Sequence, residues 1–273
     1  MAGPVVLRFR SALRHAQRVL FAAIAIVLAG CGGIPKPPPD VSLEQRVVEW
    51  NGRSVRMESY CSNVDAPILS TVFLLHGIGG MAGDGSLMRS FAVDLARAGY
   101  EAFVVRYFDS TGDWLVTRGV ALERAGEWRD VLRAVIKDHS SKFPDRAHAV
   151  LGYSLGGFLA VALAGEPTPV EAMVVLNAGV LPEHEGWDLS TLPPTHILHG
   201  SKDFVVEPVR SEVLARLAEE VGVTVSRVVL DGEGHALSAK GKMRASREMI
   251  EFFSNHLQTG QSSGDALASD SAD

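Results

Sequence analysis

The chain has 273 residues, of which 47% are hydrophobic, and a formal net charge of −6. This length suits one domain with a sizeable buried core, flanked by tails. The Lys and Arg residues are scattered along the chain and form no basic run, which excludes nucleic acid as a partner. With only two cysteines, the fold does not depend on a framework of disulfide bonds.

The first 30 residues have the composition of a signal peptide. Four arginines and no acidic residue come with an apolar run, Val19–Leu28, which is shorter than the roughly 20 residues needed to span a bilayer. The run ends in Leu28-Ala29-Gly30-Cys31, which resembles the lipobox of bacterial lipoprotein signal peptides. That resemblance implies that residues 1–30 are removed and that Cys31 is acylated. In a two-membrane bacterium, Gly32 in place of Asp after the cysteine favours the outer membrane, facing the periplasm or the outside. The alternative is an uncleaved anchor, or a plain signal peptide with a chance cysteine.

Residues 31–40 are predicted to form a tether between the membrane and the domain. Their four prolines lack the backbone N–H and favour an extended spacer. Without the four arginines of residues 1–30, Asp and Glu exceed Lys and Arg by ten. Such a charge disfavours adhesion to anionic lipid, so we expect the acyl chains on Cys31 to hold the protein at the membrane.

The domain is expected to span residues 41–257 and to open with an antiparallel hairpin. Glu44–Trp50 and Ser54–Tyr60 are rich in strand formers and flank Asn51-Gly52, which favours a type I′ turn. Residues 258–273 are mainly Ser, Gly, Asp and Ala, so we expect a disordered tail that cannot offset its ordering entropy.

From Ser70 onward, apolar strand-like runs alternate with amphipathic helical stretches. This alternation is typical of a mostly parallel sheet that is covered on both faces, so the predicted fold class is α/β, doubly wound. The predicted strands are Thr71–Leu75, Ala102–Tyr107, Ala147–Tyr153, Ala172–Asn177, Thr195–Leu198 and Ser226–Leu230. The predicted helices are Ser86–Ala98, Ala121–Asp138, Leu155–Ala164, Pro208–Val221 and Lys242–His256.

A candidate nucleophile follows the third of these strands. Gly152-Tyr153-Ser154-Leu155-Gly156-Gly157 lies between a strand and a helix rich in small residues, which is the context of a G-x-S-x-G nucleophile elbow. The serine of such an elbow sits in a strained turn, and only glycines let the neighbouring backbone pass close by. We therefore predict Ser154 as a nucleophile.

A serine hydroxyl needs a base to take its proton, and the base needs an acid to orient it. Asp203 lies in the loop after Thr195–Leu198, and His235 lies just beyond Ser226–Leu230, at strand ends where sites form in open α/β sheets. Asp231 and Glu233 compete for the role of the acid. Because both are only a few positions from His235 on the same loop, Asp203 is preferred.

An oxyanion that develops on a carbonyl oxygen needs a pair of N–H donors. Leu155 N–H, directly after the nucleophile, is the first candidate. The glycine-rich turn His76-Gly77-Ile78-Gly79-Gly80 offers the second, with Ile78 N–H preferred and Gly79 next.

Four segments resemble those of the α/β-hydrolase superfamily and occur in its order across residues 70–256. They are Leu75–Gly80, Gly152–Gly157, Gly200–Asp203 and Gly232–His235. The compact size and the Gly-x-x-Asp loop are similar to the dienelactone hydrolase-like branch. That branch commonly uses a cysteine nucleophile, so a serine at position 154 puts dienelactone chemistry in doubt and favours ester hydrolysis.

Some residues near these segments are candidates for lining a substrate pocket. The loop Arg106–Trp114 either lines the pocket or is an ordinary solvated loop, and His76 is expected to hold the oxyanion loop. The pocket candidates are His76, Gly79, Tyr107, Asp109 and Tyr153. His184, His196 and His199 show no metal-ligand spacing with Cys or carboxylate residues and are interpreted as ordinary loop and strand histidines, so no metal is expected.

The resulting prediction is a serine hydrolase that cleaves carboxylic esters of small or extended acyl substrates through an acyl-enzyme, without a cofactor. The segment Val180–Pro194 has only 15 residues, which favours an open cleft over a large lid. An acyltransferase or a thioesterase on the same three residues is one alternative. A binding lipoprotein that keeps the fold without turnover is another. The oligomeric state cannot be predicted from the sequence.

Overall fold

The computed structural model describes residues 34–68, 70–163, 168–180 and 188–257. The predicted signal peptide, Cys31 and the predicted tail lie outside the described residues. Contacts divide the chain into Met1–Lys36 and Pro37–Asp273, and every described helix and strand belongs to the second unit. Within the described ranges, no helix combines the length and the apolar character that a bilayer crossing requires.

The domain opens with the predicted hairpin. Strands β1 (Val41–Trp50) and β2 (Arg53–Ser62) pair in antiparallel fashion, and the turn residues Asn51 and Gly52 both have positive φ, 47° and 75°. A positive φ at both central positions defines the type I′ turn that the sequence predicts. Contacts with the domain already begin at Pro38–Asp40, at the end of the predicted tether, where the Asp40 carbonyl accepts the Asn63 N–H at 2.9 Å.

Within the described ranges, eight strands form one sheet in the order β1-β2-β4-β3-β5-β6-β7-β8. Strands β3 to β8 pair in parallel fashion, and β2 joins β4 antiparallel, which confirms the predicted fold class. Their bounds are β3 (Ser70–Leu75), β4 (Glu101–Val105), β5 (Ala147–Tyr153), β6 (Ala172–Leu176), β7 (Thr195–Gly200) and β8 (Val225–Leu230). β4 ends two residues earlier than predicted because Tyr107–Ser110 turn into a short 3-10 helix, η1.

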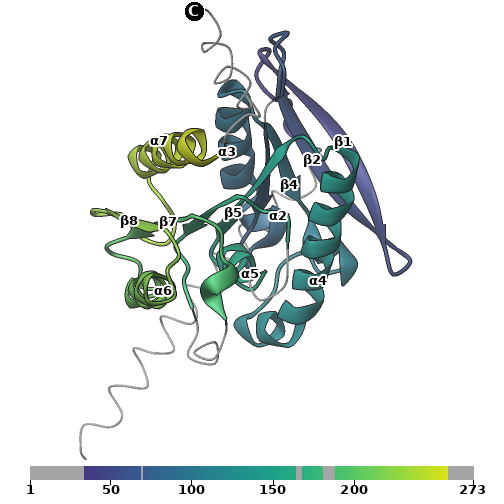
Figure 1. Cartoon of the computed structure of the whole chain (residues 1–273). Coiled ribbons are helices and arrows are strands. Elements are labelled where there is room, and N and C mark those ends of the chain that lie inside the picture. Colours follow the sequence, from purple (N-terminus) through teal and green to yellow (C-terminus); the bar gives the residue numbers. More distant parts are fainter. Residues whose placement is uncertain (1–33, 69, 164–167, 181–187, 258–273) are drawn as a thin grey trace, which may run out of the picture. The chain divides into compact units, whose positions relative to one another are not determined.

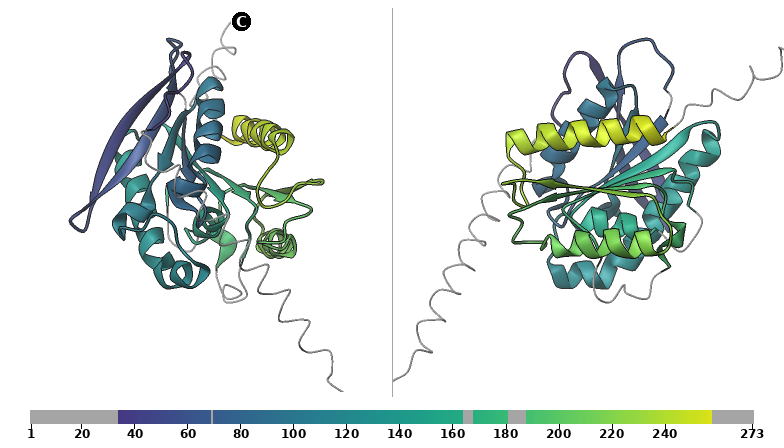
Figure 2. Two further views of the ribbon diagram at one scale, coloured as in Figure 1. Left: turned by 180° about the vertical axis from the view of Figure 1, so that it is seen from behind. Right: turned by 60° about the vertical axis from the view of Figure 1, so that its left-hand side comes forward.

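Helices cover both faces of the sheet (Figure 1). α3 and α7 pack on one face and α4, α5 and α6 on the other; in the right panel of Figure 2, α7 lies above the edge of the sheet and α6 below it. The bounds are α2 (Gly80–Gly83), α3 (Gly85–Arg97), α4 (Arg118–Lys142), α5 (Leu155–Val161), α6 (Val209–Glu220), α7 (Ala239–His256) and the short η3 (Leu189–Thr191). α4 and α7 begin three residues before their predicted starts because the side chains of Thr117 and Ser238 cap them.

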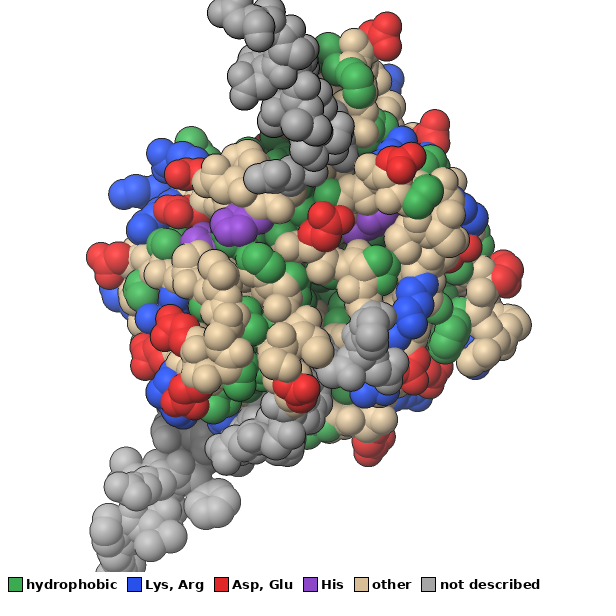
Figure 3. Space-filling model, viewed as in Figure 1, with side chains coloured by type: hydrophobic (Ala, Val, Ile, Leu, Met, Phe, Trp, Pro, Cys, Tyr) green, Lys and Arg blue, Asp and Glu red, His purple; other side chains and the backbone are tan. Residues whose placement is uncertain are grey.

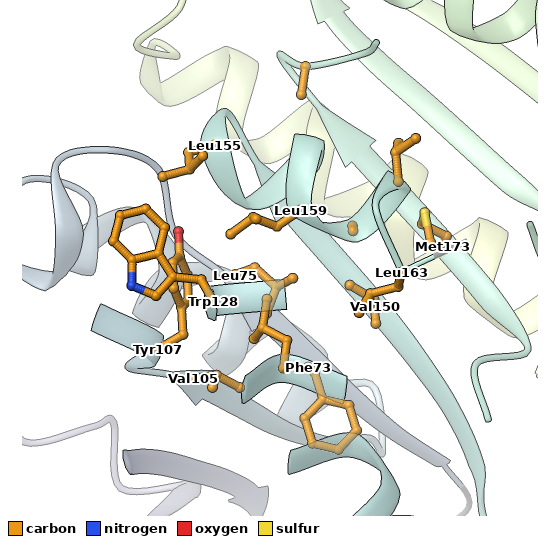
Figure 4. Close-up of a cluster of buried hydrophobic side chains, with 14 of the residues drawn as sticks. Phe73, Leu75, Val105, Tyr107, Trp128, Val150, Leu155, Leu159, Leu163 and Met173 are labelled. Carbon is orange, nitrogen blue, oxygen red and sulfur yellow. The ribbon is translucent and has the colours of Figure 1, made fainter. Parts of the chain in front are cut away.

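Two buried clusters of apolar side chains, one on each face of the sheet, form the core. The cluster under α4 and α5 joins Phe73, Trp128 and Leu155 (Figure 4), and the cluster under α3 and α7 contains Phe91 and Phe253. β3 to β6 are buried along their whole length, as expected for the centre of a parallel sheet. Ser154 thus lies between two buried elements, β5 and α5.

The surface carries charges of both signs. On the face shown in Figure 3, basic and acidic side chains alternate without a continuous basic patch. This distribution agrees with the scattered Lys and Arg of the sequence.

Candidate active site

Ser154 occupies a strained turn between β5 and α5. Its φ of 52° and ψ of −120° are uncommon for a residue with a side chain, and its N–H donates to the Leu176 carbonyl at 2.9 Å. A Cβ at Gly152 would collide with the Gly156 carbonyl, and a Cβ at Gly156 would collide with the Leu75 carbonyl. The two glycines therefore permit the close backbone contacts of the turn, as the elbow motif predicts.

The three side chains predicted to cooperate meet at one edge of the sheet. Ser154 follows β5, Asp203 follows β7 and His235 follows β8, so all three lie at carboxyl ends of strands. The distance from Ser154 Oγ to His235 Nε2 is 2.9 Å, and that from His235 Nδ1 to Asp203 Oδ2 is 2.7 Å. A continuous hydrogen-bonded series thus connects the hydroxyl, the imidazole and the carboxylate.

The Asp203 carboxylate is only 2% exposed and makes several hydrogen bonds. Burial raises the pKa of this carboxyl, but hydrogen bonds from His199, His235 and the Val206 N–H outweigh burial and hold the pKa well below its usual range. An ionised carboxylate can only accept hydrogen bonds, so His235 Nδ1 carries the proton toward Asp203. Nε2 of the neutral ring is then free to accept the proton of Ser154 Oγ.

The loop that carries His235 is fixed by its backbone. Asn177 Nδ2 donates to the His235 carbonyl at 2.8 Å, and the Tyr153 hydroxyl donates to the same oxygen at 3.0 Å. Asn177 Oδ1 also accepts the Gly200 N–H at 2.9 Å. One side chain at the end of β6 therefore ties β7 to the histidine loop.

The two competing acids make other contacts. The Glu233 carboxylate accepts the Ser238 N–H at 2.7 Å, at the start of α7, and Asp231 accepts the Ser201 hydroxyl at 3.3 Å. Neither makes a hydrogen bond to the His235 ring in the described structure, whereas Asp203 does.

The glycine-rich turn after β3 lies next to the serine. Ile78 and Leu155, which carry the two predicted oxyanion donors, line the same cavity as Ser154. Among the described residues, no acceptor pairs with Ile78 N–H, whereas Gly79 N–H donates to Asp84 Oδ2 at 3.1 Å. The choice of Ile78 N–H over Gly79 N–H as the second oxyanion donor stays a prediction.

A cavity of about 730 Å³ opens in front of Ser154. Apolar side chains of α4, α5 and the loop after β7 form most of its wall: Ala121, Leu122, Ala125, Leu155, Phe158, Leu159, Ala162, Phe204, Val205 and Val206. Phe204 is 91% exposed, so the cavity opens toward solvent beside the loop that carries Asp203. Four charged residues also line the cavity: Arg118, Arg129, Glu207 and Arg210.

The five pocket candidates from the sequence are not among the residues that line this cavity. His76 and Tyr107 are fully buried and stack on each other at 4.2 Å, and burial lowers the pKa of His76 to about 4. Asp109 pairs with Arg56 at 2.8 Å, and Gly79 and Tyr153 contact the site through its supporting loops. The prediction that these five residues line the pocket is therefore wrong for this cavity, because these residues are buried or paired with neighbouring segments.

Sequence reasoning missed three side chains that support the site. The sequence predicts that His199 is an ordinary histidine. In the structure, His199 Nε2 lies 3.4 Å from Asp203 Oδ2 and 2.9 Å from the Val206 carbonyl, so this ring contacts the carboxylate that also binds His235. No role is predicted from the sequence for Asn177 or Asp84. Of the two, Asn177 has a signal in the sequence, because it is a polar residue at the carboxyl end of a buried strand, where sites form in α/β sheets.

A metal centre was not expected, and His184, one of the histidines considered for it, lies outside the described residues. In the described part of the chain, no three His, Cys, Asp or Glu side chains come together as ligands for a metal ion.

Solved structures of several hydrolases share this fold. They include a dienelactone hydrolase from Anabaena variabilis (TM-score 0.60, 17% identity, covering 80% of this chain and 100% of that chain). An esterase domain from a Rhodothermus marinus protein has a TM-score of 0.63 at 18% identity, with 80% and 100% covered. A dienelactone hydrolase-like promiscuous phosphotriesterase from metagenomic libraries has a TM-score of 0.66 at 18% identity, with 80% and 100% covered. At these identities the likeness is one of fold.

No curated protein matches the sequence. A family model described as the alpha/beta hydrolase fold matches residues 70–219, more than half of the chain, and this stretch contains the elbow and the acid loop. The sheet order, the strained serine turn and this match together assign the chain to the α/β-hydrolase family.

Proposed function

We infer that the protein is a serine hydrolase that cleaves carboxylic esters through an acyl-enzyme, with Ser154 as nucleophile, His235 as base and Asp203 as the orienting acid. The observation that carries this inference is the unbroken hydrogen-bonded series from Ser154 Oγ through the His235 ring to Asp203. The fold family and the esterase and hydrolase names of the similar structures are consistent with it.

Acylation would begin when Ser154 Oγ attacks the carbonyl carbon of the ester while its proton moves to His235 Nε2. The carbonyl π bond opens onto oxygen, and the oxyanion accepts hydrogen bonds from the N–H groups of Ile78 and Leu155. The C–O bond to the alcohol then breaks, and the leaving oxygen takes the proton from the imidazolium. Asp203 holds the ring in the required tautomer and stabilises its charged form.

Deacylation repeats these steps with water as the nucleophile. His235 Nε2 takes a proton from water, the hydroxide oxygen adds to the acyl carbon, and collapse of the oxyanion breaks the bond to Ser154 Oγ. The serine regains its proton from His235, and a carboxylic acid leaves. The cycle needs no cofactor.

The cavity suggests the part of the substrate that is bound. Its wall of Phe158, Leu159 and other apolar side chains suits an aliphatic or aromatic acyl group. At about 730 Å³, it falls within the range of drug-sized ligand pockets, so it has room for more than an acetyl group.

The test uses nitrophenyl esters of increasing acyl length together with a fluorophosphonate probe. Ser154→Ala should abolish turnover and labelling, while Ser254→Ala, a matched change on the exposed side of α7, should leave both intact. Labelling of Ser154→Ala at the wild-type level would contradict the assignment. A wild type that is not labelled would support a binding protein that has kept the fold.

Product analysis distinguishes hydrolysis from acyl transfer. In added alcohol, a hydrolase releases mainly the free acid, whereas an acyltransferase gives mainly the new ester. A parallel panel of thioesters shows whether an oxygen ester or a thioester is the preferred substrate.

We further propose that the protein is attached to a membrane by acyl chains on Cys31, with residues 31–40 as the tether. The support comes from the sequence alone: the Arg-rich start, the apolar run Val19–Leu28 and the Leu-Ala-Gly-Cys segment. Metabolic labelling with a fatty acid should be lost in Cys31→Ala and kept in Cys61→Ala, which changes the second cysteine. Equal labelling of both variants would contradict the proposal.

A further inference from the structure

Asp84 lies at the junction of α2 and α3, at the position where an aspartate side chain usually caps the following helix. Here the side chain makes no capping hydrogen bond to α3. Its carboxylate turns back instead, and Oδ2 accepts the Gly79 N–H at 3.1 Å; the Gly77 N–H also acts on this carboxyl and lowers its pKa. The carboxylate therefore binds the turn that carries Ile78 instead of the N-terminal N–H groups of α3.

Gly77 separates this carboxylate from the nucleophile. A Cβ at position 77 would lie 2.8 Å from Asp84 Oδ2 and 3.0 Å from Ser154 Cβ. No side chain fits between them, so the carboxylate, the turn and the serine pack as three successive layers.

Other groups hold the same turn through its carbonyls. The Tyr107 hydroxyl donates to the His76 carbonyl at 2.6 Å, and Val116 N–H donates to the Ile78 carbonyl at 3.0 Å. Asp84 accepts the Gly79 N–H at 3.1 Å, and the Gly77 N–H acts on the same carboxyl. Within the described ranges, Ile78 N–H has no acceptor, and Ile78 lines the cavity beside Ser154.

We propose that Asp84 is a positioning residue that fixes the turn Gly77–Gly79 so that Ile78 N–H is held ready for the oxyanion. The proposal rests on the proposed serine-hydrolase function. Because Asp84 acts through the backbone, its effect belongs to the transition state, where the oxyanion exists, and not to binding of the neutral ester.

The charge of Asp84 gives this role a pH dependence. Burial raises the pKa of its carboxyl to about 6, while the N–H of Gly79 and the charge of His235 act in the opposite direction. The other titratable side chains acting with it are Tyr107 and Tyr153, which stay neutral because burial raises the pKa of each. Below about pH 6 the carboxylate gains a proton and becomes a weaker acceptor for the turn.

The experiment compares Asp84→Asn with wild type and with Asp138→Asn, a control that removes an exposed carboxylate on α4. Asp84→Asn should lower kcat about 10-fold to 100-fold with KM changed less than about twofold, since loss of one oxyanion donor costs about 100-fold or more. A boronic acid that forms a tetrahedral adduct with Ser154 should bind more weakly by a similar factor. Asp138→Asn should match wild type.

Two results would overturn the proposal: an unchanged kcat in Asp84→Asn, or a rise in KM without a fall in kcat. The pH profile is a second test. The acid limb of kcat in wild type should include the ionisation of Asp84 near pH 6, and Asp84→Asn should lack it; identical acid limbs in the two proteins would contradict the proposal. If neither wild type nor Ser154→Ala hydrolyses any ester, the proposed hydrolase function is wrong. If wild type is active and Asp84→Asn is equally active, the hydrolase function stands and only the role of Asp84 is wrong.

Discussion

Asn177 Nδ2 lies 2.8 Å from the carbonyl oxygen of His235, 58 positions further along the chain. Asn177 itself has a φ of 50°, and its Oδ1 accepts the Gly200 N–H. The backbone of His235 is therefore fixed by β6, and its ring is fixed by Asp203 after β7. We predict that residues outside the proposed catalytic series, such as Asn177, control the orientation of the His235 ring.

Asn177→Ala should reduce kcat about 10-fold or more while KM changes little, because the histidine loop loses its anchor and the ring leaves its productive orientation. Removing a buried amide leaves the Gly200 N–H unsatisfied, which should also lower the free energy of unfolding by about 1–3 kcal/mol. Steady-state kinetics and urea unfolding measure the two effects. Tyr153→Phe, which removes the second donor to the same oxygen, should have the smaller effect; a wild-type kcat in Asn177→Ala would contradict the role.

Asp203→Asn should lower kcat by about 10⁴-fold, a loss of the size found when the acid of such a series is replaced by its amide. The Asn side chain can donate to Nδ1, which would favour the tautomer with the proton on Nε2, where it cannot accept from Ser154. Rates with a nitrophenyl ester check this expectation. Asp231→Asn, which changes the nearby exposed carboxylate, is the control, and equal losses in both variants would argue against Asp203 as the acid.

Asp84→Asn should change stability in a pH-dependent way. The pKa of Asp84 is raised from its unfolded value of 3.8 to about 6, so the folded state binds this proton more tightly than the unfolded state does. The free energy of unfolding of wild type therefore falls as the pH rises from about 4 to about 6. An amide at position 84 does not ionise, so the variant does not lose this stability. The free energy of unfolding of the variant relative to wild type should therefore rise between pH 4 and pH 7.5, by at most about 3 kcal/mol. Denaturant unfolding at both pH values tests this, and a difference that does not vary with pH would contradict it.

Ala125→Phe should shorten the acyl groups that the enzyme accepts. Ala125 of α4 and Phe158 of α5 both line the cavity, and a phenyl ring at position 125 would occupy space that a long acyl chain needs. We expect kcat/KM for an octanoyl ester to fall at least about 10-fold relative to an acetyl ester, since each excluded methylene contributes about 0.8 kcal/mol of binding. Ala125→Ser keeps the volume and should preserve the wild-type preference. Equal losses for both esters in Ala125→Phe would indicate that the acyl chain binds elsewhere.

The sequence by itself determined the sheet, the hairpin turn and the serine elbow. Each depends on a local pattern: apolar alternation, the Asn51-Gly52 pair, or glycines two positions on either side of Ser154. It also predicted Asp203 and His235, because in a parallel sheet the loops after β7 and β8 must emerge at the same edge as the loop after β5.

Only the tertiary structure decided which side chains support the site and where the substrate space lies. Asp84 could have capped α3, and Tyr107 and Asp109 could have lined the cavity, according to everything that local pattern reveals. Their partners, Gly79, His76 and Arg56, are set by how η1, the hairpin and the turn Gly77–Gly79 pack together. Such contacts between distant segments depend on the packing of whole elements, which residue spacing along the chain does not encode.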